Sequence, residues 1–222
     1  MYYNKLENIS SKPDIVKNTN IGLMRCHFLL ENWSNANSYA DKVLASQQLN
    51  PNVKLEAQFA KGISSFHIGK YTESRVALQW VNENTSTEFG AESRYYLAEI
   101  AFNEKDWSRT ELAIQYMMDM KPQYDFWIAK AYLLQSKLNI EKGDLFKAEQ
   151  DLNTIIMNYP HQEDGILSQA KQQLDELMQL KAPKVDENPK PEEVPAEIEI
   201  DETQPAPIEE EIIEIQPENE TK

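Results

Sequence analysis

Apolar side chains between residues 13 and 160 recur in a pattern of paired helical segments. A large apolar residue follows a short polar stretch at four anchor positions, Trp33, Tyr71, Trp107 and Leu145, which lie 38, 36 and 38 positions apart. A segment with apolar residues at helical spacing precedes each anchor, and a second such segment follows it. The pattern therefore predicts four pairs of helices, each pair joined by a tight polar turn.

The residues that break helices agree with this division. Pro13, Pro51, Pro122 and Pro160 fall between the predicted pairs, where a helix must begin or end. Two glycines, at positions 69 and 143, fall in the turns inside the pairs. Alternating β-branched residues are almost absent before residue 182, so we expect no sheet.

The repeating unit also has characteristic residues at fixed places. Small side chains stand where the two helices of a pair would approach, a large residue stands at the turn, alanine comes early in the second helix, and proline closes the pair. The residues that fit are Gly62, Ala98, Trp33, Tyr71, Trp107, Ala36, Ala148, Pro122 and Pro160, and residues 95 to 122 match best. This arrangement resembles the tetratricopeptide repeat (TPR) family, whose unit has about 34 residues. Met24 at a small position and Ser74 at an alanine position depart from it.

The resemblance implies an all-α fold, a right-handed solenoid of antiparallel helix pairs. We expect residues 1–12 to be the second helix of an incomplete preceding repeat, and residues 13–160 to be four TPR-like pairs. Residues 161–181 are expected to form the polar capping helix that ends a solenoid. Residues 182–222 are predicted to be a disordered acidic tail rich in proline and glutamate.

Charge is distributed unevenly along the chain. Of the 37 Asp and Glu residues, 14 lie in residues 182–222 with only three lysines, so this tail accounts for most of the net charge of −15. Neither part has a basic face for phosphate, and we expect no nucleic-acid binding. No apolar run approaches the length of about 18 residues that a membrane span needs, and we expect no membrane insertion.

The candidate chemistry is sparse. The single cysteine, Cys26, precedes His27, but the repeat alignment places Ser64 and Ile100 at the position of Cys26 in the next two units. The pair is therefore interpreted as packing material, with Cys26 a small buried hydrophobe. One cysteine and three dispersed histidines do not make a metal site, and no glycine-rich phosphate loop is present. We expect no catalytic activity, cofactor or metal.

In the TPR family the first helices of the pairs line a concave groove that holds a peptide or a partner helix. The resemblance places these residues in the groove: Arg25, Phe59, Ile63, His67, Tyr95, Glu99, Asn103, Lys130, Lys137 and Glu141. Phe28, Phe66 and Phe102 are interpreted as packing between repeats. Some TPR co-chaperones bind a carboxylate with a clamp whose positions here are Ile21, Arg25, Ala60, Glu92 and Tyr96, and none of them matches.

The sequence thus predicts a non-catalytic protein-interaction scaffold. Its layout looks like the C-terminal section of long TPR proteins of bacterial envelopes, which implies the periplasm or cell envelope if the chain belongs to a longer protein with a signal sequence. If Met1 is the true start, a cytoplasmic regulator is favoured. A third alternative is a substrate-docking region of an enzyme whose catalytic domain lies upstream. Alternating Ile and Glu at 196–202 and 208–216 could contact a basic surface or a partner's sheet edge, or serve as a solvated spacer.

Overall fold

The computed structural model describes residues 12–182, and within this range the regular structure is entirely α-helical, which confirms the predicted all-α class. Apart from Lys12 and Ala182, the expected N-terminal helix and acidic tail lie outside the described residues. The helices are α2 (Pro13–Leu29), α3 (Trp33–Leu44), α4 (Pro51–His67), α5 (Tyr71–Asn84), α6 (Glu88–Asn103), α7 (Trp107–Met118), α8 (Asp125–Glu141), α9 (Leu145–Asn158) and α10 (Ile166–Lys181).

The turns inside the pairs share one backbone geometry. Each anchor residue is the first residue of its helix, and the residue two positions earlier has a positive φ. In the last pair the backbone N–H groups of Gly143 and Asp144 donate to the carbonyls of Ile140 and Asn139, and equivalent bonds occur in the other three turns. This is the left-handed termination that satisfies the free carbonyls of a helix end. The residues with positive φ are Glu31 (54°), Gly69 (75°), Lys105 (58°) and Gly143 (79°).

The helix starts are also encoded locally. The side chains of Asn50, Asp106 and Asp144 accept hydrogen bonds from backbone N–H groups in the first turns of α4, α7 and α9. These acceptors satisfy donors that have no partner inside the helix. Pro13 and Pro51 stand at the first positions of α2 and α4, where the absent N–H costs nothing.

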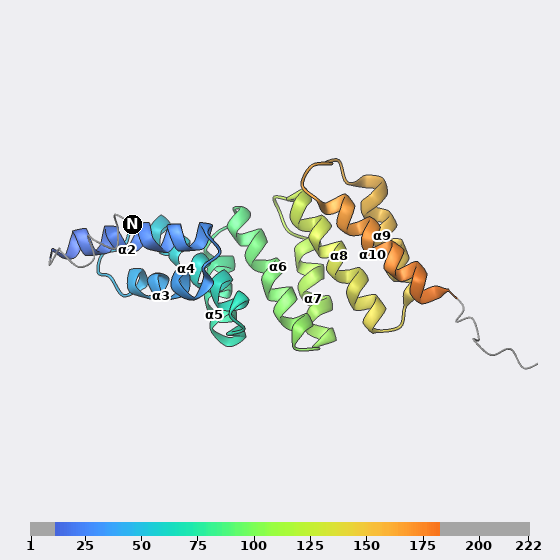
Figure 1. The fold of residues 1–222 in the computed structure, drawn as a ribbon, viewed down its shortest axis with the longest axis horizontal. Coiled ribbons are helices and arrows are strands. Elements are labelled where there is room, and N and C mark those ends of the chain that lie inside the picture. Colours follow the sequence, from blue (N-terminus) through green and yellow to red (C-terminus); the bar gives the residue numbers. More distant parts are fainter. Residues whose placement is uncertain (1–11, 183–222) are drawn as a thin grey trace, which may run out of the picture. The chain divides into compact units, whose positions relative to one another are not determined.

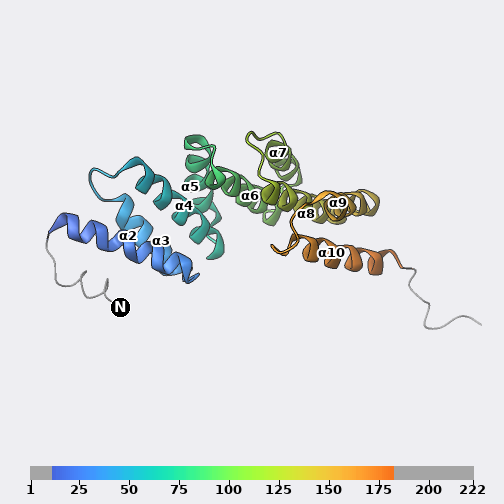
Figure 2. The ribbon, with the colours of Figure 1, turned by 90° about the horizontal axis from the view of Figure 1, so that it is seen from above.

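The helices pack in sequence order (Figure 1; Figure 2). In addition, alternate helices lie close to one another in the series α2, α4, α6, α8 and α10. We call this series the first-helix row. Within residues 12–182, the second helices α3, α5, α7 and α9 do not approach one another in this way. The first-helix row is therefore the more closely spaced side of the stack.

The core consists of four clusters, each built from three consecutive helices: a pair and the first helix of the following unit. Small residues allow the helices of a pair to approach. A Cβ atom at Gly62 of α4 would lie 2.5 Å from Cδ2 of Leu78 on α5. Ser74 Oγ donates to the carbonyl oxygen of Gly62 at 2.7 Å, which joins the same two helices at the position where the family pattern has alanine.

Candidate functional site: the surface of the first-helix row

The ten predicted groove residues all belong to the first-helix row, but they do not share one degree of exposure. Ile63 (2% exposed) is a core residue packed with Leu78 and Val81 of α5, which corrects its assignment to a binding surface. Phe59 (5%) belongs to the same cluster, but it also borders a hollow between α2 and α4. The Phe59 ring faces the neighbouring first helices, since it contacts Phe28 of α2 and Phe89 of α6. Tyr95 (5%) is also mostly buried, and only its hydroxyl end is available for polar contacts.

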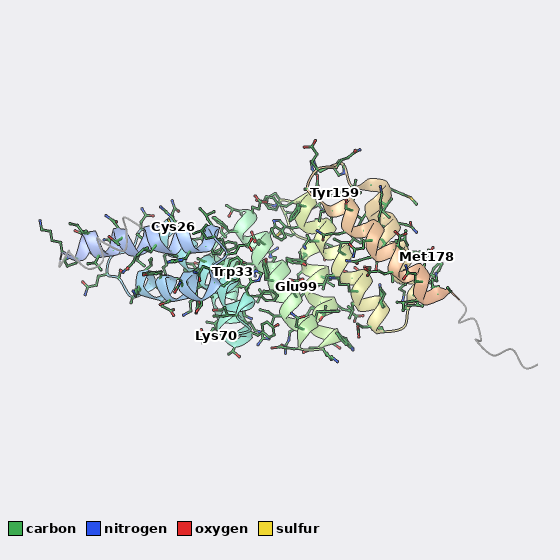
Figure 3. The ribbon with its side chains drawn as sticks, in the orientation of Figure 1. Cys26, Trp33, Lys70, Glu99, Tyr159 and Met178 are labelled. Carbon is green, nitrogen blue, oxygen red and sulfur yellow. The ribbon has the colours of Figure 1, made fainter. Side chains whose placement is uncertain are left out.

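Aromatic rings form a continuous line of contacts along the row. Phe28 of α2 meets Trp33 edge-on at a centroid distance of 5.5 Å, and Trp33 stacks on His67 of α4 at 4.2 Å. His67 contacts Tyr96 of α6 at 5.9 Å. From Tyr96 the contacts continue through Tyr95 to Trp127 of α8, with centroid distances of 5.5 and 5.6 Å. Figure 3 labels Trp33, at the start of α3, and Glu99 on α6. These rings form a stiff connection between four successive first helices.

Charged groups surround the centre of this line. The Tyr95 hydroxyl donates to Glu99 Oε1 at 2.6 Å, and the Lys130 ammonium lies 4.9 Å from the centre of the Tyr95 ring. Burial lowers the pKa of Lys130, although the nearby Glu99 opposes that effect. Burial, followed by the charges of Glu92, Glu99 and Glu31, raises the pKa of Tyr96. Three glutamates, Glu31, Glu92 and Glu99, thus lie near these rings together with Lys130.

The remaining predicted residues lie on α2, α6 and α8. Arg25 of α2 pairs with Glu56 of α4 through two hydrogen bonds of 2.6 Å. Asn103 Nδ2 lies 3.4 Å from the Tyr71 hydroxyl, which it approaches as a weak donor. Lys137 and Glu141 of α8 are exposed. The structure thus brings Tyr95, Glu99 and Lys130 together and leaves Arg25 with a different partner.

A hollow of about 250 Å³ lies between α2 and α4 and was not predicted. Phe28 and Phe59 line it, and Phe89 at the start of α6 closes one side. Leu29, which also lines the hollow, is 81% exposed, and Phe89 is 41% exposed. The sequence pattern does not indicate Phe89, because the residues that carry the TPR resemblance lie in the later part of each first helix. The signal that could have found it is Trp127, which occupies the same place in the next repeat.

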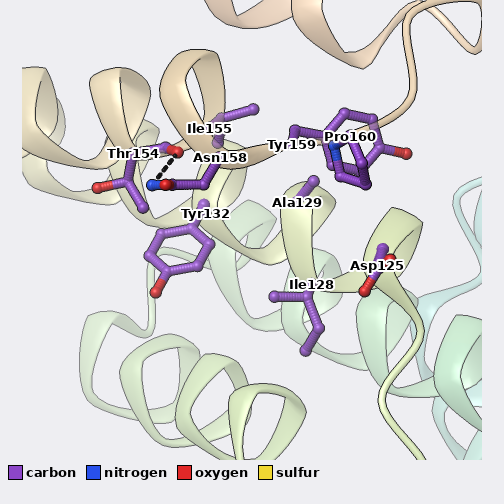
Figure 4. A pocket seen from close by; sticks show the side chains of 9 residues that line it. All are labelled: Asp125, Ile128, Ala129, Tyr132, Thr154, Ile155, Asn158, Tyr159 and Pro160. Carbon is purple, nitrogen blue, oxygen red and sulfur yellow. Dashed lines mark hydrogen bonds between the residues drawn. The ribbon is translucent and has the colours of Figure 1, made fainter.

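Two further hollows lie away from these residues. The first, of about 130 Å³ between α8 and α9, is shown in Figure 4. Its lining includes Tyr132, Tyr159 and Asn158, whose Nδ2 donates to the Thr154 carbonyl oxygen at 3.0 Å. It is smaller than the roughly 300 Å³ of typical ligand pockets. The second, of about 550 Å³, lies beside α5, α6 and α7 on the side of the second helices.

The Cys26 prediction needs correction. Cys26 is exposed, and His27 stacks on Tyr39 with ring centroids 5.4 Å apart. The equivalent residues Ser64 and Ile100 are fully buried, since a preceding helix pair covers them, whereas no described helix precedes α2.

No group of three or more His, Cys, Asp or Glu side chains between residues 12 and 182 is arranged to hold a metal ion. None of the helices described is both long and apolar enough to cross a membrane.

Comparison with protein-family models, with curated proteins and with solved structures finds no match for this chain.

Proposed function

We propose that this protein is a non-catalytic interaction scaffold of the TPR type, which binds a peptide or helix of a partner protein on the surface of its first-helix row. The row would form the concave side of a right-handed solenoid. Because the stacked helices hold this surface in place, the ordering cost on binding falls mainly on the partner.

One observation carries the proposal. First helices approach one another along the row while second helices do not, and a line of aromatic rings from Phe28 to Trp127 follows the closer side. Aromatic residues beside charged groups such as Glu99 and Lys130 are typical of surfaces that anchor peptides. The layout supports a role within a larger bacterial envelope protein, with a cytoplasmic regulator or an enzyme's docking region as the alternatives.

Affinity capture with the full chain and two surface variants tests this function. We expect Arg25→Glu and Lys137→Glu to reduce the amount of partner captured, while Lys147→Glu on α9 leaves it unchanged. All three remove an exposed basic residue. Circular dichroism should show the same helix content for each variant. Unchanged capture by both surface variants would place binding elsewhere, and loss of capture only after deletion of residues 183–222 would assign it to the tail.

A further inference from the structure

Two hollows on the first-helix surface meet at one side chain. The hollow of about 250 Å³ between α2 and α4 is bordered by Phe89, which also borders a second hollow of about 430 Å³. The second hollow lies between the first turns of α4 and α6, where Leu55, Glu88 and Glu92 line it. The two hollows together form a depression that we call the Phe89 depression. One end is mainly apolar and also includes the Arg25–Glu56 ion pair, and the other end is acidic.

The apolar end is lined by aromatic rings from three successive first helices. Phe59 contacts Phe28 at a centroid distance of 5.9 Å and Phe89 at 4.7 Å. The highly exposed Leu29 extends this lining to the surface. A large apolar side chain of a partner would remove both its own surface and that of Leu29 and Phe89 from water.

Comparing equivalent positions in successive helix pairs shows which charged residue of the first-helix row lacks an oppositely charged partner. Glu56, Glu92 and Lys130 occupy one equivalent position in successive units, and Arg25, Ile63 and Glu99 occupy another. Arg25 pairs with Glu56, and the charge of Glu99 lies close enough to Lys130 to oppose the lowering of the Lys130 pKa by burial. The equivalent partner of Glu92 is Ile63, which carries no charge.

The surroundings of Glu92 agree with the register. No basic residue lines the acidic hollow, and among the described side chains neither Glu88 nor Glu92 forms an ion pair. Burial and then the charge of Glu88 raise the pKa of Glu92 to about 7. Two neighbouring carboxylates without a cation gain the most from a positive group brought by a ligand.

We propose that the Phe89 depression binds a peptide carrying a large apolar side chain and a neighbouring Lys or Arg, with the apolar group beside Phe89 and the cation between Glu88 and Glu92. This inference rests on the proposed function and specifies its partner. Charge complementarity selects the occupant. The chain's own tail carries 14 acidic residues, which these carboxylates would repel.

Fluorescence anisotropy with the full chain and three short labelled peptides tests the proposal. The peptides share one apolar residue and differ in its neighbour, which is Arg, Gln or Glu. We expect the Arg peptide to bind about tenfold more tightly than the Gln peptide, and the Glu peptide to bind most weakly. Added salt should reduce the advantage of the Arg peptide.

Protein variants then assign the contacts. Glu92→Gln should weaken binding of the Arg peptide about tenfold and leave binding of the Gln peptide unchanged. Phe89→Ala should weaken binding of both. The matched control is Glu83→Gln, which removes an exposed carboxylate outside both hollows. An NMR titration provides an independent readout, because a bound cation should lower the pKa of Glu92.

Other outcomes overturn the proposal in distinguishable ways. Preferred binding of the Glu peptide, lost in Lys137→Glu, would preserve peptide binding and contradict the cationic partner. If none of the peptides binds while Arg25→Glu and Lys137→Glu still reduce capture, the proposed function stands and this inference fails. If capture is also unaffected, both fail.

Binding of a tail peptide, residues 196–216, or self-association lost in Phe89→Ala would identify a different occupant.

Discussion

The imidazole of His67 lies flat against the indole of Trp33, with ring centroids 4.2 Å apart and an interplanar angle of 11°. Trp33 is the anchor that begins α3, and His67 is the last residue of α4, so the stack joins two successive helix pairs. Burial lowers the pKa of His67, while the charges of Glu31 and Glu99 act in the opposite direction. Burial of the ring therefore favours the neutral imidazole, whereas its charged neighbours favour the protonated form.

Removing the Trp33 ring should change the pKa of His67. In Trp33→Ala the imidazole regains water while Glu31 and Glu99 remain, so its pKa should rise to or above its ordinary value of 6.5. NMR titration of the His67 ring protons measures this. The matched control is Trp107→Ala, which removes the equivalent anchor of the third pair. An unchanged pKa in Trp33→Ala would contradict the assigned cause.

The close approach of α4 and α5 should make Gly62 intolerant of a side chain. A methyl group there would lie 2.5 Å from Cδ2 and 2.6 Å from Cγ of Leu78, which is fully buried. Alanine favours a helix by about 1 kcal/mol relative to glycine, but overpacking typically costs about 1–3 kcal/mol. We expect Gly62→Ala to lower the free energy of unfolding by up to about 2 kcal/mol in chemical denaturation. A less than additive effect with Leu78→Ala would identify this contact as the cause.

The left-handed turns predict opposite effects for two substitutions. Lys105 has φ 58° and is exposed, so Lys105→Gly should stabilise the protein by about 0.5–1 kcal/mol. Gly143 has φ 79°, and no neighbouring atom lies within 4 Å of the place that a Cβ atom would take. Gly143→Ala should therefore destabilise the protein by about 1 kcal/mol through the backbone alone. Thermal and chemical unfolding measure both, and effects of the same sign would contradict the shared turn geometry.

Glu92 should make stability depend on pH. Its pKa is about 7 in the folded protein and 4.5 ordinarily, so the folded state holds the proton more tightly than the unfolded state. The stabilisation from this tighter proton binding is complete below pH 4.5 and is lost as the pH rises through 7. The loss lowers the free energy of unfolding by up to about 3 kcal/mol. Glu92→Gln should therefore be more stable than the original protein at mildly alkaline pH and similar in acid.

The comparison is an unfolding curve at each pH, with Glu83→Gln as the control for loss of an exposed carboxylate. An equal gain in stability at all pH values would rule out ionisation of Glu92 as the cause. Together with the peptide experiment, a stabilised but weakly binding Glu92→Gln would show that this carboxylate is retained for binding at the expense of stability.

The sequence predicted the helices well because their signals are local. Trp33 and Leu145 follow short polar stretches, Asp106 and Asp144 cap helices, and Gly143 accepts a positive φ, so each boundary depends on residues within one turn. The exposure of the candidate site could not be predicted in the same way. Ile63 and Glu99 occupy equivalent places, yet one is in the core and the other is part of the charged centre.

By itself the sequence determined the all-α class, the division into helix pairs and the positions of their turns, because apolar spacing and capping act over a few residues. Only the tertiary structure decided that Arg25 meets Glu56, that Cys26 is exposed and that Phe89 borders two hollows. These relationships depend on how far each helix is rotated against residues about a full repeat away. That rotation is set by the packing of many side chains at once and leaves no local signal in the chain.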